Sequence, residues 1–181
     1  MRPSPVHPTG VERTFGADEL IVSKTDPRGV ITYANHVFAR VARYSEVELI
    51  HQPHSIVRHP DMPRAVFKLL WDTITAGQEI FAYVLNLASD GAHYWVLAHV
   101  TPSFGPGRTV TGYHSSRRSP DPGIVAAVRP IYALLLAEEQ RHERPHEALE
   151  ASTKLLTTLL ADAGMTYEEF VWSIEPVAMA R

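Results

Sequence analysis

The chain has 181 residues, of which 45% are hydrophobic and 20% are charged, a composition typical of one globular domain with an appendage. Its formal net charge of −3 offers no basic field for phosphate backbones, so we expect no nucleic acid among its partners. Cysteine is absent, which excludes disulfides, thiolate nucleophiles, Cys-ligated zinc and iron–sulfur clusters.

The first segment, residues 1–17, is rich in proline and has no hydrophobic periodicity, so it is predicted to be a flexible arm or cap. It also lacks the apolar stretch of a signal peptide. No apolar run elsewhere approaches the roughly 20 residues that a membrane-spanning helix needs. We therefore expect a cytoplasmic protein without membrane insertion.

The next segment reads as a β-hairpin followed by two short helices. Turn residues at 26–29 separate two β-rich runs, the second of which covers residues 30–33. Asn35 is suited to start a helix, because its side chain can accept a bond from a free backbone N–H. Ser45 and Glu48 have the spacing of a capping box, which predicts a second helix start.

Residues 52–77 form a stiff, polar loop that leads into an amphipathic helix. Three prolines interrupt the loop, and Pro63 is placed to be the first residue of the helix, which Gly77 would end. Apolar residues recur along this helix at the spacing of one face. The polar side chains of the segment "QPHSIVRHPDMP" are therefore expected to lie beside a helix that packs on a core.

Three strand-like runs follow, at residues 80–89, 93–104 and 109–118, separated by turn sequences. With the first hairpin they predict an α+β fold, a five-stranded antiparallel sheet with helices on one face, over residues 18–120. Such a layer encloses a pocket between the sheet and the helices. The strand end "SSRR", residues 115–118, is expected to be solvated.

Residues 121–181 are predicted to form a C-terminal helical tail. Two helical patterns are separated by a break at Pro145, and Thr166 is suited to cap a short third helix. The charge run at 138–144 is expected to be an exposed helix face. The apolar stripes of the tail need either the sheet or another subunit to cover them, so we expect an output or dimerisation element and a homodimer.

The order of strands and helices is that of a PAS domain. The phrases "TDPRGVITYAN", "QPHSIVRHPDMPRAVFKLLWDTITAG" and "GAHYWVLAHVTP" closely resemble the flavin-binding PAS domain of aerotaxis receptors, redox and energy sensors related to chemotaxis. The resemblance runs from about Leu20 to Ser119, and the "RHPDMP" hexapeptide is its most specific part. It implies a PAS sensory domain at residues 18–120 that binds FAD without a covalent bond.

The resemblance also implies which side chains shape the cofactor site. The "RHPD" turn and the helix after it would supply the wall, and two asparagines would supply amides. The expected cofactor-binding residues are Asn35, His54, Arg58, His59, Asp61, Trp71 and Asn86. An arginine fork suits a pyrophosphate or a ring carbonyl, an indole suits a flat ring, and an amide suits a pyrimidine edge.

The residues themselves leave alternatives open. Arg58 and Asp61 could instead form an ion pair that staples the loop, and Trp71 could belong to the core. His59 could be a flavin contact, a loop residue or the axial ligand of a haem. The resemblance also breaks at residues 87–89, where Leu, Ala and Ser replace the basic side chains of the family, so cofactor retention is in question.

Three functions compete, and the first is preferred. The chain would be an FAD-binding sensory protein that relays redox, oxygen or energy state through its tail to a signalling partner such as a chemoreceptor, a histidine kinase or another transducer. The alternatives are a gas sensor that binds haem b, and a cofactor-free PAS adaptor. No catalytic constellation or metal site is expected, so we predict a protein that is not an enzyme.

Overall fold

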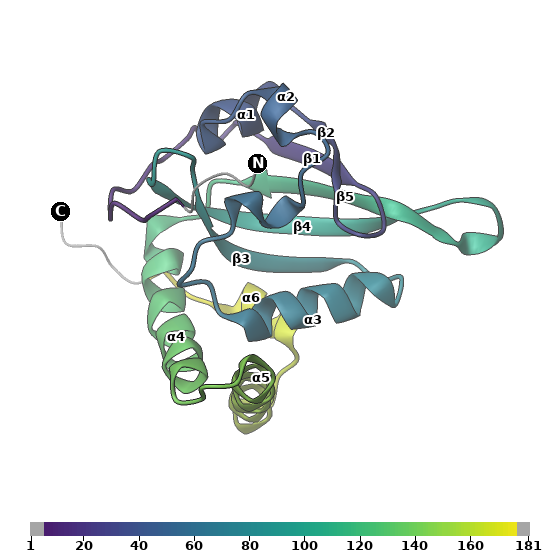
Figure 1. Cartoon of the computed structure of the whole chain (residues 1–181). Helices are drawn as coiled ribbons and strands as arrows, with labels where there is room; N and C mark the ends of the chain where they lie inside the picture. Colours follow the sequence, from purple (N-terminus) through teal and green to yellow (C-terminus); the bar gives the residue numbers. More distant parts are fainter. Residues whose placement is uncertain (1–5, 177–181) are drawn as a thin grey trace.

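A five-stranded antiparallel sheet, in the order β2-β1-β5-β4-β3, is the centre of the computed structural model (Figure 1), which describes residues 6–176. The predicted fold is confirmed. The strands are β1 (Ile21–Thr25), β2 (Ile31–Ala34), β3 (Ile80–Leu87), β4 (His93–Phe104) and β5 (Val110–Arg118). The strands β2 and β3 are consecutive in the chain but form the two opposite edges of the sheet, and the helices between them connect these edges.

The turn between β1 and β2 is held by its own side chain. Asp26 Oδ1 accepts bonds from the backbone N–H groups of Arg28 and Val30, both at 2.9 Å. Gly29 has φ +80°, a left-handed conformation that glycine adopts without strain. The predicted hairpin is thus present, with the turn chemistry that its sequence indicated.

Four helical segments connect β2 to β3: α1 (His36–Ala42), α2 (Glu46–Leu49), η1 (His54–Val57) and α3 (Arg64–Thr75). Asn35 caps α1 by accepting from Phe38 N, and Ser45 and Glu48 form the expected capping box of α2. Pro63 is the N-cap of α3 and not its first helical residue, because its ψ of 135° is extended. Gly77, with φ +79°, follows the helix end as expected.

Each strand places alternate side chains on the two faces of the sheet. The face toward η1 and α3 carries Val84, Ala98 and Ser115, which line a cavity. On β4, Tyr94, Trp95 and Val96 are all buried, so both faces of this strand are covered. The second cover comes from the tail, because the ring of Tyr132 lies 5.9 Å from that of Trp95.

The tail consists of α4 (Pro122–Gln140), α5 (Pro145–Asp162) and α6 (Tyr167–Ser173). It lies beside β3 and α3, and α3 lies between the sheet and α5 (Figure 1). The hydroxyl of Tyr132 donates to the backbone oxygen of Tyr83 on β3, at 2.6 Å. No helix in the described part of the chain is both long and apolar enough to cross a membrane.

The sequence predicted an exposed helix face at residues 138–144, but Glu139 within it is buried. Only 8% of it is exposed, and its Oε1 accepts from the backbone N–H groups of Arg64 at 2.7 Å and Ala65 at 3.4 Å. These are free donors at the start of α3, where Pro63 provides no side-chain cap. The tail therefore caps the helix that forms one wall of the cavity.

The described part of the N-terminal segment lies against the turn between β3 and β4. Arg13 N donates to His93 O at 2.7 Å, and the Arg13 guanidinium binds both carboxylate oxygens of Asp90. Phe15 is buried in the core. Residues 1–5 of the predicted arm, like residues 177–181 of the predicted tail, lie outside the described residues.

Candidate functional site

A cavity of about 510 Å³ lies between the sheet and the helices η1 and α3, where the sequence indicated a pocket. This volume is within the range of small-molecule sites, about 300 to 1,000 Å³. Leu149 of the tail helix α5 also reaches its lining. The cavity is therefore bounded by the sheet, by the helices after β2 and by the tail.

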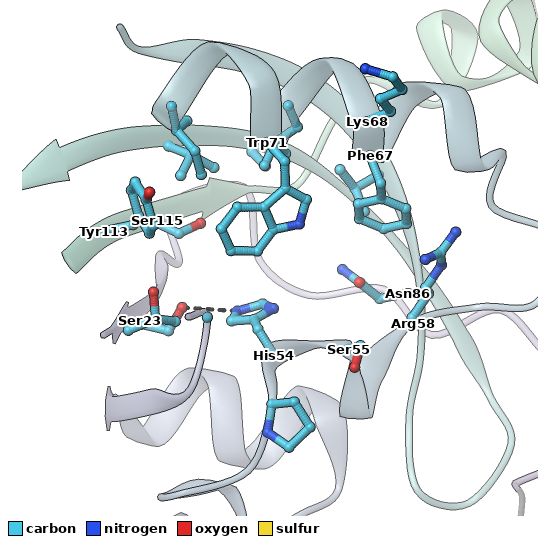
Figure 2. A pocket seen from close by; sticks show the side chains of 18 of the residues that line it. Ser23, His54, Ser55, Arg58, Phe67, Lys68, Trp71, Asn86, Tyr113 and Ser115 are labelled. Carbon is cyan, nitrogen blue, oxygen red and sulfur yellow. Dashed lines mark hydrogen bonds between the residues drawn. The ribbon is translucent and has the colours of Figure 1, made fainter. Parts of the chain in front are cut away.

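Aromatic side chains from α3 form one wall. Trp71 and Phe67 lie one turn apart, and Figure 2 shows both projecting from α3 into the cavity. The indole meets the ring of Tyr113 on β5 edge to face, with centroids 5.5 Å apart. It also lies on Gly29, where a Cβ would come within 2.9 Å of Trp71 Cη2. The hairpin turn, the sheet and α3 together fix the indole.

The opposite wall is polar and deeply buried. Ser23 Oγ lies 3.1 Å from His54 Nε2, a hydrogen bond drawn in Figure 2. The same Oγ accepts from Arg117 Nη2. A serine hydroxyl has one donor and two acceptor positions, so Ser23 can bond to both the arginine and the imidazole. Burial, and then the charge of Arg117, lower the pKa of His54 to about 3.

A third wall brings together the loop and the edge strand. Arg58 pairs through its backbone with Asn86 of β3, and both side chains line the cavity. The Arg58 guanidinium lies 4.3 Å from the centre of the Phe67 ring, a cation–π contact. Burial lowers the pKa of Arg58, although its guanidinium remains charged at neutral pH. An arginine fork and an amide thus flank the aromatic wall.

The rim of the cavity is basic. Arg28, Arg64 and Lys68 line it with half-exposed or exposed side chains. Each has a carboxylate nearby: Asp26 for Arg28, Glu139 for Arg64 and Asp72 for Lys68. Cations at the mouth of an apolar cavity favour a ligand with a flat apolar part and an anionic end. The arrangement suits a nucleotide-like molecule inserted with its ring first.

The structure brings together four of the seven expected site residues. His54, Arg58, Trp71 and Asn86 line the cavity. The other three do not: Asn35 is occupied as the α1 cap and by bonds to Val22 N and Leu20 O, and Asp61 is exposed. His59 is buried, and its Nδ1 accepts from Asp61 N. No Arg58–Asp61 ion pair occurs among the described residues.

Several lining residues were missed by the sequence reasoning. Arg117 belongs to the "SSRR" strand end that was expected to be solvated, but only 2% of it is exposed. Its alternation with Tyr113 and Ser115 on β5 was the available signal, because residues two apart share a face. Leu149 carried no such signal, because its place depends on how α5 packs against α3.

The segment that departs from the aerotaxis-receptor pattern lies away from the cavity. Leu87 and Ala88 are buried at the end of β3, and Ser89 Oγ donates to Arg43 O in the turn. None of the three lines the cavity. The basic rim described above comes from other elements, so these substitutions do not remove charge from it.

The lowered pKa of His54 predicts a loss of stability in mild acid. The unfolded chain takes up the proton below pH 6.5, the ordinary value, whereas the folded protein resists it down to about pH 3. The contribution is therefore complete above pH 6.5 and is lost as the pH falls toward 3, by at most about 1.4 kcal/mol per pH unit. Urea unfolding of ligand-free protein at pH 7, 6 and 5 measures this slope.

The matched variants are His54→Gln and His146→Gln, since His146 is exposed at the start of α5. His54→Gln should flatten the fall in unfolding free energy between pH 7 and 5. His146→Gln should leave the fall unchanged. Equal slopes in the wild type and His54→Gln would contradict a buried neutral imidazole.

The order of strands and helices, with the cavity between the sheet and the helices, is that of a PAS domain. The family model described as PAS fold matches residues 21–114, just over half of the chain. The chain belongs to the PAS family.

Two relatives are signalling proteins. The aerotaxis receptor of Escherichia coli (strain K12) is 39% identical over 132 residues, which is 73% of this chain and 26% of that protein. The nitrogen fixation regulatory protein of Klebsiella pneumoniae is 32% identical over 99 residues, which is 55% of this chain and 20% of that protein. The chain thus spans about a quarter or less of the relatives it matches.

Solved structures share the fold. A light-oxygen-voltage domain studied with a flavin analogue superposes with a TM-score of 0.55 at 16% identity, covering 64% of this chain and 86% of that one. The light-state LOV domain of the blue-light photoreceptor Aureochrome1 gives 0.51 at 25% identity, covering 67% and 91%. A PAS domain from Colwellia psychrerythraea gives 0.52 at 20%, covering 56% and 86%.

Proposed function

We propose that the chain is a cytoplasmic sensory module that binds FAD without a covalent bond and relays its redox state through the tail to a signalling partner. The observation that carries the proposal is the cavity itself, which has an aromatic wall, an arginine and an amide beside it, and a basic rim. An isoalloxazine ring would lie against Trp71 and Phe67. The pyrophosphate would meet the cations of the rim.

Each side chain has a defined part in this proposal. Trp71 offers a flat apolar face, and Asn86 offers a donor and an acceptor to the pyrimidine edge. Arg58, already held over Phe67, is placed between ring and rim. When bound, FAD supplies the electron chemistry, and the protein supplies position and electrostatics.

The tail is suited to transmit a change at the ligand. Leu149 of α5 lines the cavity, and Glu139 of α4 caps the start of α3, the helix that carries Trp71. A shift of α3 would therefore act on two tail helices directly. Leu134 and Trp172, both 56% exposed on α4 and α6, would be available to a second copy or to a signalling partner.

The haem alternative is less well supported. It requires His59 to face the ligand, but His59 does not line the cavity, and its Nδ1 is engaged by Asp61 N. His54 does line the cavity, but its Nε2 is bonded to Ser23. Absence of cysteine excludes flavin–cysteine photoadducts, so redox change is the favoured signal.

The absorbance spectrum of the purified protein tests the proposal. We expect a flavin spectrum that bleaches on reduction, with FAD released on denaturation. A Soret band would select the haem sensor instead, and a colourless protein that does not take up added FAD would favour the cofactor-free adaptor.

Trp71→Ala is expected to lower the affinity for FAD about tenfold to a hundredfold, because the ring loses a stacking face worth about 1 to 3 kcal/mol. The dissociation constant, measured by quenching of flavin fluorescence, checks this. Trp172→Ala is the matched control, because Trp172 is exposed on α6 and does not line the cavity. Equal affinity of both variants for FAD would show that Trp71 does not contribute to binding.

A further inference from the structure

Arg117 lies in the wall of the cavity with an incomplete set of partners. Only 2% of the residue is exposed, and Nη2 donates to Ser23 Oγ. Its Nε and Nη1 are buried and have no hydrogen-bond partner in the described structure. Burial lowers the pKa of Arg117 to about 10, so the guanidinium stays charged at neutral pH. Two charged donors are therefore unsatisfied behind the cavity wall, and the charge acts on the contents of the cavity through space.

Within residues 6–176, no carboxylate is paired with this charge. The groups around it come from four elements: Ser23 on β1, Phe38 on α1, His54 on η1 and Tyr94 on β4. His54 is neutral above about pH 3, and burial raises the pKa of Tyr94, so neither supplies a negative charge at neutral pH. No ion pair of Arg117 occurs among the described residues.

The remaining contact is the face of the Phe38 ring, 4.5 Å from the guanidinium carbon. A cation–π contact of this kind compensates only part of the cost of burying a charge. Buried charges in proteins are otherwise paired or satisfied by a ligand. The guanidinium therefore leaves a positive charge without compensation beside the cavity, and a negative charge on a molecule in the cavity would be stabilised by it.

We propose that Arg117 is the anion-stabilising residue of this cavity and that it favours the reduced, negatively charged form of the bound flavin over the oxidised form. The inference rests on the proposed function. Uptake of two electrons and one proton converts the neutral oxidised ring into a reduced ring with one negative charge, shared by N1 and the C2 carbonyl. The electrons come from an external donor, dithionite in the experiment below.

The geometry makes this role distinct from that of the basic rim. Arg28, Arg64 and Lys68 are in contact with water, where their charges are screened. Arg117 is enclosed with neutral neighbours, where a charge acts strongly on a ring beside it. A residue in this position sets the redox equilibrium of the ring, whereas the rim sets the affinity for the phosphates.

The test compares Arg117→Met, Arg117→Lys and the control Arg118→Met. Arg118 is exposed and lies on the other face of β5. The reduction midpoint of the flavin-loaded protein is measured by dithionite titration against a reference dye. Loss of the charge in Arg117→Met should shift the equilibrium about a hundredfold toward the oxidised form, about 60 mV for a two-electron couple. Arg117→Lys should keep most of the wild-type midpoint, and Arg118→Met all of it.

A second measurement separates this role from a structural one. An unpaired buried charge opposes folding, so ligand-free Arg117→Met should unfold at the same urea concentration as the wild type or at a higher one. Unfolding at a lower concentration, or failure to fold, would make Arg117 a structural residue and overturn the inference. An unchanged midpoint in yellow Arg117→Met would overturn it as well.

The outcome also distinguishes this inference from the function on which it rests. If the wild type takes up no flavin, both the proposed function and this inference are wrong. If the wild type binds flavin but its reduction midpoint equals that of Arg117→Met, only the role proposed for Arg117 is wrong. Binding of oxidised FAD by both, with a midpoint lowered only in Arg117→Met, supports both proposals.

Discussion

Gly29→Ala is expected to lower the free energy of unfolding by about 3 kcal/mol. The left-handed backbone at φ +80° costs an alanine about 1 to 2 kcal/mol. Its Cβ would also lie 2.9 Å from Cη2 of Trp71, and overpacking of this kind costs about 1 to 3 kcal/mol. Urea unfolding followed by circular dichroism measures the loss.

Gly107→Ala is the matched control for this prediction. Gly107 also has a left-handed backbone, with φ +70°, but a Cβ there would meet nothing within 4 Å. Its loss should be limited to the backbone cost of about 1 to 2 kcal/mol. The difference between the two variants reports the contact with Trp71. Equal losses would show that the indole moves aside freely and is not fixed by the turn.

Glu139→Ala is expected to destabilise the protein by about 2 kcal/mol. The substitution leaves the backbone N–H groups of Arg64 and Ala65 without the acceptor that now caps α3. An unsatisfied buried donor costs about 1 to 3 kcal/mol, and loss of a helix cap costs about 0.5 to 2 kcal/mol. Urea unfolding gives the total, and amide hydrogen exchange at residues 64 and 65 locates the effect.

Glu138→Ala is the control, since Glu138 precedes Glu139 on α4 but pairs with Arg141 and His142 at the surface. Its loss should stay within about 0.5 kcal/mol. Exchange at residues 64 and 65 should accelerate in Glu139→Ala alone. A similar small effect in both variants would mean that the tail does not hold the start of α3, and would weaken the proposed relay.

The local elements of the fold follow from local chemistry. The turn at Asp26 to Gly29, the caps at Asn35 and Ser45 and the strand runs depend on side chains a few residues apart, and the structure has them as expected. Pro63 differs by one position because an extended residue can serve as the cap of the helix it precedes. Such differences of one residue do not change the arrangement of the layers.

The lining of the cavity was predictable only in part. His54, Arg58, Trp71 and Asn86 line it, and their role in binding a cofactor stays a prediction. Asn35 does not line it, because capping α1 uses its amide, and Asp61 projects toward solvent. Sequence pattern alone cannot tell these roles apart, since a polar side chain in a loop can cap a helix, face solvent or bind a ligand.

By itself, the sequence determined the class of fold, the order of its strands and helices and the segment that forms the cavity wall. These depend on periodicity, turn residues and caps, which act over a few positions. Only the tertiary structure decided that Arg117 is buried without a counter-ion and that Glu139 caps α3. Both depend on segments far apart in the chain, where burial and partners are set by packing between elements, which no local pattern records.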